Sequence, residues 1–127
     1  LLSRGDQNEE TLDLKKAGIF PLVHGVRSMA LEMRLSELGT TARIGALVAA
    51  GRLTAEMGAD LIDSLHFFMG LKLQAGLAEI AMNRPVSGGI QVSKLSSLDR
   101  DLLKDTLGVV KRFKALLRQH FHLDMVS

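Results

Sequence analysis

Apolar residues recur at helical spacing along most of the chain, and the first clear stripe follows a proline. A helix is predicted from about Pro21 to Gly39, because proline suits the first turn, where its missing N–H costs nothing, and glycine commonly ends a helix. The members of the stripe are Leu22, Val26, Met29, Ala30 and Met33. Their spacing of three or four residues would place them on one face, toward a core.

Two further helices are predicted in the middle of the chain. A short one spans residues 40–50, with Thr40 or its neighbour as the cap and Gly51 as the stop. A long one spans residues 54–82 and begins with Thr54 as its cap. The apolar surface of the long helix is wide, so we expect it to lie at the centre of a bundle.

The last predicted helix runs from about residue 98 to residue 121. Ser96 followed by Asp99 resembles a capping box in which Asp replaces the usual Glu. Its apolar seam consists of Leu102, Leu103, Leu107, Val110, Phe113, Leu117 and Phe121. Lysines and arginines lie largely off this seam, as expected for a helix with one solvated side.

Segments outside the helices carry weaker patterns. Residues 1–10 are polar and acidic and are predicted to be a lead-in. Residues 11–15 alternate apolar and polar side chains as a short strand does, and residues 16–18 break that pattern at a glycine. Since one strand is not stable alone, it is predicted to be the end of a neighbouring domain. Residues 86–94 are expected to form a loop.

The predicted fold is all-α, an antiparallel and mostly up-and-down four-helix bundle of three long helices and one short one. Residues 17–127 would form this domain, and residues 1–16 would be its lead-in and the tail of a preceding domain. The chain of 127 residues suits one core, and apolar residues make up 46% of it. Trp and Tyr are absent, which favours helix packing over a β-sandwich.

Charge and cysteine content narrow the possible functions. The net charge of +2 is too small to argue for nucleic-acid binding, which usually needs a concentrated basic face. Cysteine is absent, which excludes disulfides and thiolate chemistry and fits a reducing cytoplasm. No apolar run approaches the ~18 residues of a membrane span. We therefore expect a cytoplasmic protein that binds neither membrane nor nucleic acid.

Catalytic and metal motifs are missing from the sequence. GxSxG, HExxH and the glycine-rich phosphate loops do not occur. His120 and His122 are two residues apart and would point away from each other on a helix. His66 is expected to pack beside the core. We predict no catalytic residue, no metal ligand and no cofactor in this chain.

Cationic side chains gather at the start of the first predicted helix. Lys15 and Lys16 precede the helix, and helix N-termini attract anions. His24, Arg27 and Arg34 fall within one angular sector of that helix. Together they would hold a phosphate or a carboxylate-rich partner, although composition alone favours a solvated face without a ligand, because runs of charge are usually surface.

Two later cations have open interpretations. Arg43 is predicted either to pair with Glu37 or to join the anion-binding group. Lys72 lies on an otherwise apolar line of the long helix, so it would extend to solvent, pair with an acid or meet a ligand.

The order and spacing of four segments resemble one bacterial family. The segments are LDLKKAGIFPLVHGVRSMALE, TTARIGAL, ADLIDSLHFFMGLKLQ and LSSLDRDLLKDTLGVVKRFK. They are similar to the nucleotidyltransferase substrate-binding domain, over about residues 11–121. In that family the domain follows a nucleotidyltransferase domain similar to part of PII-protein uridylyltransferase, often with cyclic-nucleotide-binding and CBS domains ahead of both.

The resemblance implies a bundle similar to the carboxy-terminal domain of kanamycin nucleotidyltransferase. The basic positions of the family correspond to Lys15, Arg27, Arg43 and Lys72. Magnesium and a nucleoside triphosphate would belong to the preceding catalytic domain. That domain needs paired aspartates after a Gly-Ser turn, a pattern missing from this sequence.

The expected function is therefore that of an accessory substrate-binding domain in a bacterial signalling nucleotidyltransferase. The nucleotidyltransferase domain would be its partner, and nucleotide or an acceptor protein its ligand. The parent protein would be the enzyme. The alternative is a non-catalytic helical module for regulation or dimerisation. In the second case its partner would be another copy of the chain, in a homodimer. A large exposed apolar patch would favour that module, and a basic cleft beside the first helix would favour substrate binding.

Overall fold

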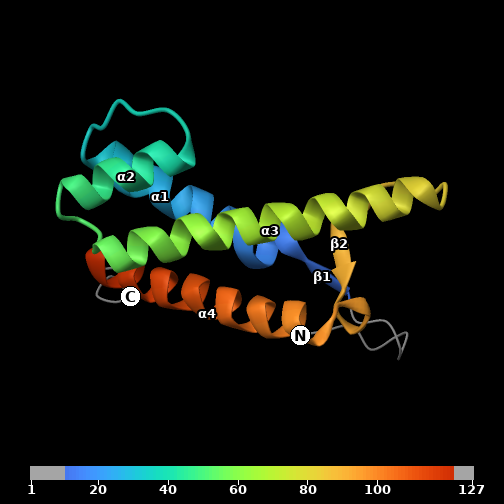
Figure 1. The fold of residues 1–127 in the computed structure, drawn as a ribbon. Coiled ribbons are helices and arrows are strands. Elements are labelled where there is room, and N and C mark those ends of the chain that lie inside the picture. The colour runs from blue at the N-terminus through green and yellow to red at the C-terminus, as the bar shows by residue number, and fades with distance from the viewer. Residues whose placement is uncertain (1–10, 122–127) are drawn as a thin grey trace.

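The computed structural model describes residues 11–121, which form a four-helix bundle with a small sheet at one end (Figure 1). The helices are α1 (Phe20–Glu32), α2 (Thr40–Ala49), α3 (Ala55–Ala81) and α4 (Ser97–His120). The other elements are strands β1 (Thr11–Asp13) and β2 (Gly89–Gln91), a π-helical turn η1 (Lys15–Ile19) and a 3₁₀ turn η2 (Val92–Lys94). The predicted helical bundle of three long helices and a short one is confirmed. The predicted lead-in over residues 1–10 and His122 lie outside the described residues.

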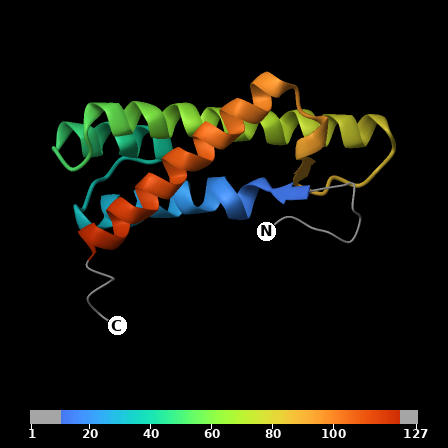
Figure 2. The same cartoon turned by 90° about the horizontal axis from the view of Figure 1, so that it is seen from below.

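Helix α3 runs antiparallel to the other three helices (Figures 1 and 2). One connection departs from a strict up-and-down order, because residues 33–39 cross back and α2 then runs in the same direction as α1. A contact of 3.1 Å between Arg52 Nε and Met33 Sδ joins the residues that follow these two helices. The ends of α1 and α2 therefore lie together, as parallel neighbours require.

Helix α1 ends earlier than predicted, at Glu32 instead of Gly39. Arg34 adopts a left-handed backbone with a φ of 56°. The N–H of Leu35 donates to the carbonyl of Ala30 at 3.0 Å, which completes a helix-ending motif usually built on glycine. Because arginine stands where glycine is usual, this helix end could not be predicted from the sequence.

Three other helix boundaries agree with their predicted signals. Thr54 Oγ1 accepts a hydrogen bond from the N–H of Met57 at 3.0 Å, and Ser96 Oγ accepts one from the N–H of Asp99 at 3.0 Å. Gly51 has a φ of 75° just after α2, a conformation that favours glycine. The predicted cap of α2 at Thr40 or its neighbour is wrong, because Gly39 is at the cap position and no side chain caps the helix. Local sequence signals therefore fix the end of α2 and the starts of α3 and α4.

The core consists of two adjoining clusters along the bundle. The first lies between α1, α2, α3 and α4 and contains Leu22, Val26, Met29, Ile44, Leu47, Leu53, Leu61 and Phe113. The second lies toward the sheet and contains Leu14, Ile19, Phe68, Leu71, Ile90, Leu103 and Val110. Of the predicted seam of the last helix, Leu103, Val110 and Phe113 are buried, whereas Leu102 is exposed. The second cluster extends the core to the strand end. Across residues 11–121 the helices lack an apolar stretch long enough to cross a bilayer.

The predicted break at Lys16–Gly18 is wrong. These residues form η1, which continues directly into α1. Gly18 is buried, and a Cβ built on it would overlap the ring of Phe68. The glycine is therefore needed for close packing between η1 and α3, not for ending an element.

The predicted loop over residues 86–94 is also wrong, and the first strand finds a partner within it. Strand β2 lies within that segment and pairs with β1 in antiparallel register, Leu12 opposite Ile90. Leu14, directly after β1, is fully buried in the second core cluster. Strand β1 is therefore packed within this domain. Strand β2 contacts α3, so the small sheet lies beside that helix.

Candidate functional site

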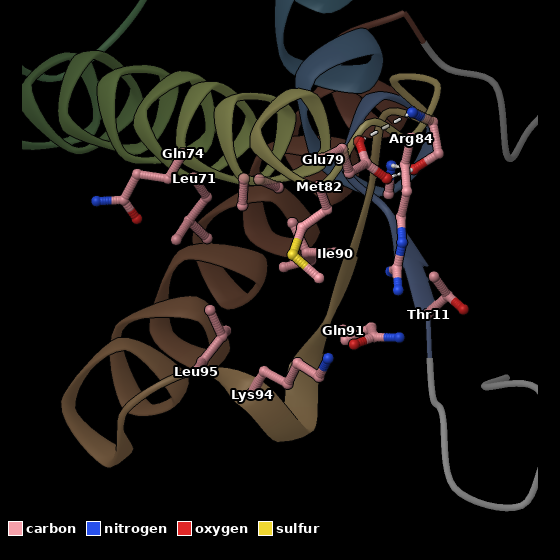
Figure 3. A pocket seen from close by; sticks show the side chains of 14 residues that line it. Thr11, Leu71, Gln74, Glu79, Met82, Arg84, Ile90, Gln91, Lys94 and Leu95 are labelled. Carbon is pink, nitrogen blue, oxygen red and sulfur yellow. Dashed lines mark hydrogen bonds between the residues drawn. The ribbon is translucent and has the colours of Figure 1, made fainter.

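A cleft opens between the second half of α3 and the segment that carries β2 and η2 (Figure 3). Its volume is about 530 Å³, which is the size of a typical small-molecule site. Residues from α3, from the turn after it, and from both strands line it. The continuous segment of residues 71–95 therefore meets Thr11 of β1 at one concave surface.

One side of the cleft is apolar. Leu71 and Ile90 belong to the second core cluster, and only 4% and 5% of their surfaces are exposed. Ala75 and Leu95 pack against the same cluster and are half-buried. Met82, at the end of α3, reaches over this side from above (Figure 3). The core thus provides a firm apolar floor.

The opposite side of the cleft is polar and cationic. Arg84 comes from the turn after α3, and Lys94 comes from η2. Figure 3 shows both side chains extending toward the region of Gln91 and Thr11. Gln74 stands at the apolar side of the opening (Figure 3). Two positive charges from separate elements therefore converge on one end of the cleft.

The turn after α3 is fastened by Glu79. The hydroxyl of Ser87 donates to Glu79 Oε2 at 2.6 Å, and the N–H of Ser87 donates to Oε1 at 3.0 Å. These hydrogen bonds, with the nearby charge of Arg84, lower the pKa of the Glu79 carboxyl below its ordinary value. The N–H of Arg84 donates to the carbonyl of Glu79 at 2.8 Å. The turn therefore holds Arg84 at the rim.

Pairing between the strands positions the other cation. Gln91 lies opposite Thr11 in the register, and η2 follows β2 immediately. The carbonyl of Leu95 accepts a hydrogen bond from Arg100 Nη1 at 2.7 Å, which ties the end of this segment to α4. Lys94 is thus held between a strand and a helix.

Three of the predicted binding residues share a different surface. Lys16, His24 and Arg27 are exposed along the outer side of η1 and α1. The ring of His24 stacks on Phe20 with centroids 5.4 Å apart and planes 10° from parallel. This is a cationic helix face, whereas the cleft lies at α3 and the sheet.

The start of the helical segment is already occupied by a carboxylate of the chain. Asp13 Oδ1 accepts hydrogen bonds from the N–H groups of Lys15 and Lys16, at 3.0 and 3.2 Å. The backbone amides expected to attract an anion are therefore satisfied from within. The side chain of Lys15 is half-buried, and that of Lys16 is exposed.

Arg43 and Lys72 lie apart from this face. Arg43 Nε donates to the backbone carbonyl of Glu37 at 3.1 Å, so it contacts Glu37 through the main chain instead of its carboxylate. Lys72 is half-buried on α3, one turn beyond Phe68. None of the six predicted binding residues lines the cleft of Figure 3, and their role in binding stays a prediction.

The outer face of the second half of α3 is apolar and exposed. Its members are Met69, Leu73, Leu77 and Ile80, each more than half exposed. They recur at helical spacing on the side away from the core. The prediction that His66 packs beside the core is wrong, because its side chain is exposed near the start of this face.

The cationic residues of the cleft were not predicted from the sequence. Arg84 follows the predicted long helix of residues 54–82, and Lys94 falls in the predicted loop of residues 86–94. No local signal identifies either, because their convergence depends on the pairing of β1 with β2. Within the described part of the chain, no group of three acidic or histidine side chains is arranged to hold a metal ion.

Comparison with known proteins gives one match. Residues 1–121 match a family model described as "Putative nucleotidyltransferase substrate binding domain". No curated protein and no solved structure matches the chain significantly. The similarity to the carboxy-terminal domain of kanamycin nucleotidyltransferase therefore stays a prediction.

Proposed function

Because the chain belongs to the family of nucleotidyltransferase substrate-binding domains, as the resemblance of its segments predicted, we propose that it positions nucleotide or acceptor for a nucleotidyltransferase domain. The observation that carries this proposal is the family match over residues 1–121, nearly the whole chain. The chemistry would belong to the partner domain, which would bring magnesium and the nucleoside triphosphate. The parent protein would be a cytoplasmic, bacterial signalling enzyme similar to PII-protein uridylyltransferase.

Two features of the structure support a binding role. The cleft at α3 combines an apolar floor with two converging cations, which is the usual composition of a ligand site. The outer side of η1 and α1 adds Lys16, His24 and Arg27 as exposed cations. Lys15, Arg43 and Lys72 complete the set proposed from the family resemblance.

The proposal is tested in a protein that carries both domains. Transfer of a labelled nucleotide to the acceptor is measured with the substrate-binding domain intact, with residues 17–121 removed, and with Arg27→Ala. We expect removal of the domain to abolish or greatly slow transfer, and Arg27→Ala to raise the KM for one substrate. Transfer that proceeds unchanged without the domain would contradict the proposed function. Unchanged transfer in the Arg27 variant alone would contradict only the role of the α1 face.

A second candidate function is favoured by the exposed apolar face of α3. Leu73, Leu77 and their neighbours form a surface that a dimer or another domain would cover. A regulatory or dimerising module would use this face to relay signals between sensor domains. Sedimentation of the chain separates the candidates, because a tight dimer that loses its association in a Leu73→Gln/Leu77→Gln variant would favour the module.

A further inference from the structure

The cleft at α3 has chemistry that distinguishes between the two possible substrates of such a domain. We propose that it binds the nucleotide, a nucleoside triphosphate, with the base on the apolar floor and the phosphates at Arg84 and Lys94. This inference rests on the proposed function and names the ligand of its site. The residues expected to bind the nucleotide therefore lie in the C-terminal half of α3 and in the segment after it, and not on α1.

The size and shape of the cleft favour a small molecule over a protein acceptor. Protein interfaces usually bury about 800 Å² on each partner and are comparatively flat. The cleft is a concave space of about 530 Å³, and small ligands bury most of their surface in sites of this kind. An acceptor protein would instead contact the wide exposed surfaces of α1 or α3.

The cationic end fits a polyphosphate. Arg84 presents a planar guanidinium, which suits the paired oxygens of a phosphate, and Lys94 adds a mobile ammonium. The nearest carboxylate on this side, that of Glu79, accepts two hydrogen bonds from Ser87, and these stabilise its charge. Because Glu79 also fixes the turn, its main effect on the site is to hold Arg84 in place.

The apolar end fits the face of a base. Leu71 and Ile90 are fixed by the core, and Ala75 and Ala78 leave open space above them. Gln74 lies beside Leu71 at this end of the cleft, and its amide extends away from Met82 and Ile90 (Figure 3). The floor is therefore apolar, which suits packing against the flat face of a base.

Calorimetric titration of the 127-residue chain tests the assignment. The probes are UTP, ATP, uridine and inorganic triphosphate, and the variants are Arg84→Gln/Lys94→Gln and Ala78→Leu. We expect a triphosphate nucleotide to bind, and the double variant to weaken it about a hundredfold, with each charge-assisted contact contributing about tenfold. Ala78→Leu should weaken the nucleotide about tenfold by filling the apolar end, and leave inorganic triphosphate unchanged.

The matched control is Lys111→Gln/Lys114→Gln, which also removes two positive charges, but from exposed positions on α4. We expect it to change affinity less than about twofold, because exposed charges beyond a Debye length are screened. Equal losses in the control and in the cleft variant would show diffuse electrostatic attraction and overturn the inference. Thermal unfolding of each variant confirms that all of them fold, since every substituted side chain is exposed.

A further variant separates the inference from the proposed function. If Lys16→Gln/Arg27→Gln abolishes nucleotide binding while the cleft variants bind normally, the site lies on α1 and the inference is wrong, although the domain still binds substrate. If the chain binds no nucleotide but transfer still requires the domain, the inference again fails alone. Transfer that does not require the domain contradicts the proposed function itself.

Discussion

The two halves of α3 differ in how they are covered. Every buried residue of the helix lies at or before Leu71, and the first half packs against the other helices and η1, with Ala59, Asp63 and His66 exposed on its outer side. After Leu71 the helix is covered only along the side that faces the sheet (Figure 1). One continuous helix therefore supports the core with its first half and presents binding surfaces with its second half. Stability and binding are expected to respond to different substitutions along its length.

The largest expected effect on stability is at Phe68, the fully buried aromatic at the end of the first half. Phe68→Ala should lower the free energy of unfolding by about 3–5 kcal/mol, because it opens a cavity between η1, α3 and α4. Met69→Ala is the matched control, since the side chain of Met69 is 51% exposed. Chemical denaturation measures both variants. A loss at Met69 as large as that at Phe68 would contradict the difference in packing.

A smaller effect is expected from two glycines, Gly18 in η1 and Gly70 in α3. Gly18→Ala should cost about 1–3 kcal/mol, because the new Cβ meets the buried ring of Phe68. Gly70→Ala should instead stabilise the chain by about 1 kcal/mol, since Gly70 is inside α3 with no neighbouring atom in reach of a Cβ. Thermal unfolding gives both values, and destabilisation by Gly70→Ala would show that this face is covered in solution.

The exposed apolar face should contribute little to the stability of the single chain. Leu73→Gln/Leu77→Gln is expected to change the free energy of unfolding by less than about 0.5 kcal/mol per site, because both side chains are already in water and the helix propensities are similar. Unfolding at several protein concentrations is the measurement. A stability of the wild-type chain that rises with concentration, and is lost in the variant, would indicate a dimer through this face.

The smallest effect is expected at Glu79 and depends on pH. Its pKa is lower in the folded chain than its ordinary value of 4.5, so the ionised form stabilises the fold. The contribution is complete above the ordinary pKa and disappears as the pH falls through the lowered value. Glu79→Gln should therefore be less stable than the wild type at neutral pH, and the difference should shrink in acid. A difference that does not change with pH would exclude the carboxylate as its source.

Local signals were sufficient for much of the fold. The caps at Thr54 and Ser96 and the stop at Gly51 act on neighbouring backbone groups, so the sequence predicts them directly. Apolar periodicity also placed most of the core residues correctly. The end of α1 escaped prediction because Arg34 takes the backbone conformation in which glycine is usual.

Contacts between distant segments explain what the sequence did not predict. Strand β2 has three residues, too few for an alternating pattern. Strand β1 was predicted from its alternation, but its partner was not, because the two strands pair across the whole of α1, α2 and α3. The cleft depends on that pairing, and so do the positions of Arg84 and Lys94 around it. Helical periodicity alone places the exposed cations of α1 on one face, so they could be predicted from the sequence.

The most direct test of the division of α3 is a map of backbone amide chemical shifts during titration of the ¹⁵N-labelled chain with UTP. We expect the changes in amide chemical shift to concentrate in residues 71–82 and 84–95, with little change in α2 and the first half of α3. Changes that follow Lys16, His24 and Arg27 along α1 instead, or an unchanged spectrum at saturating nucleotide, would contradict it.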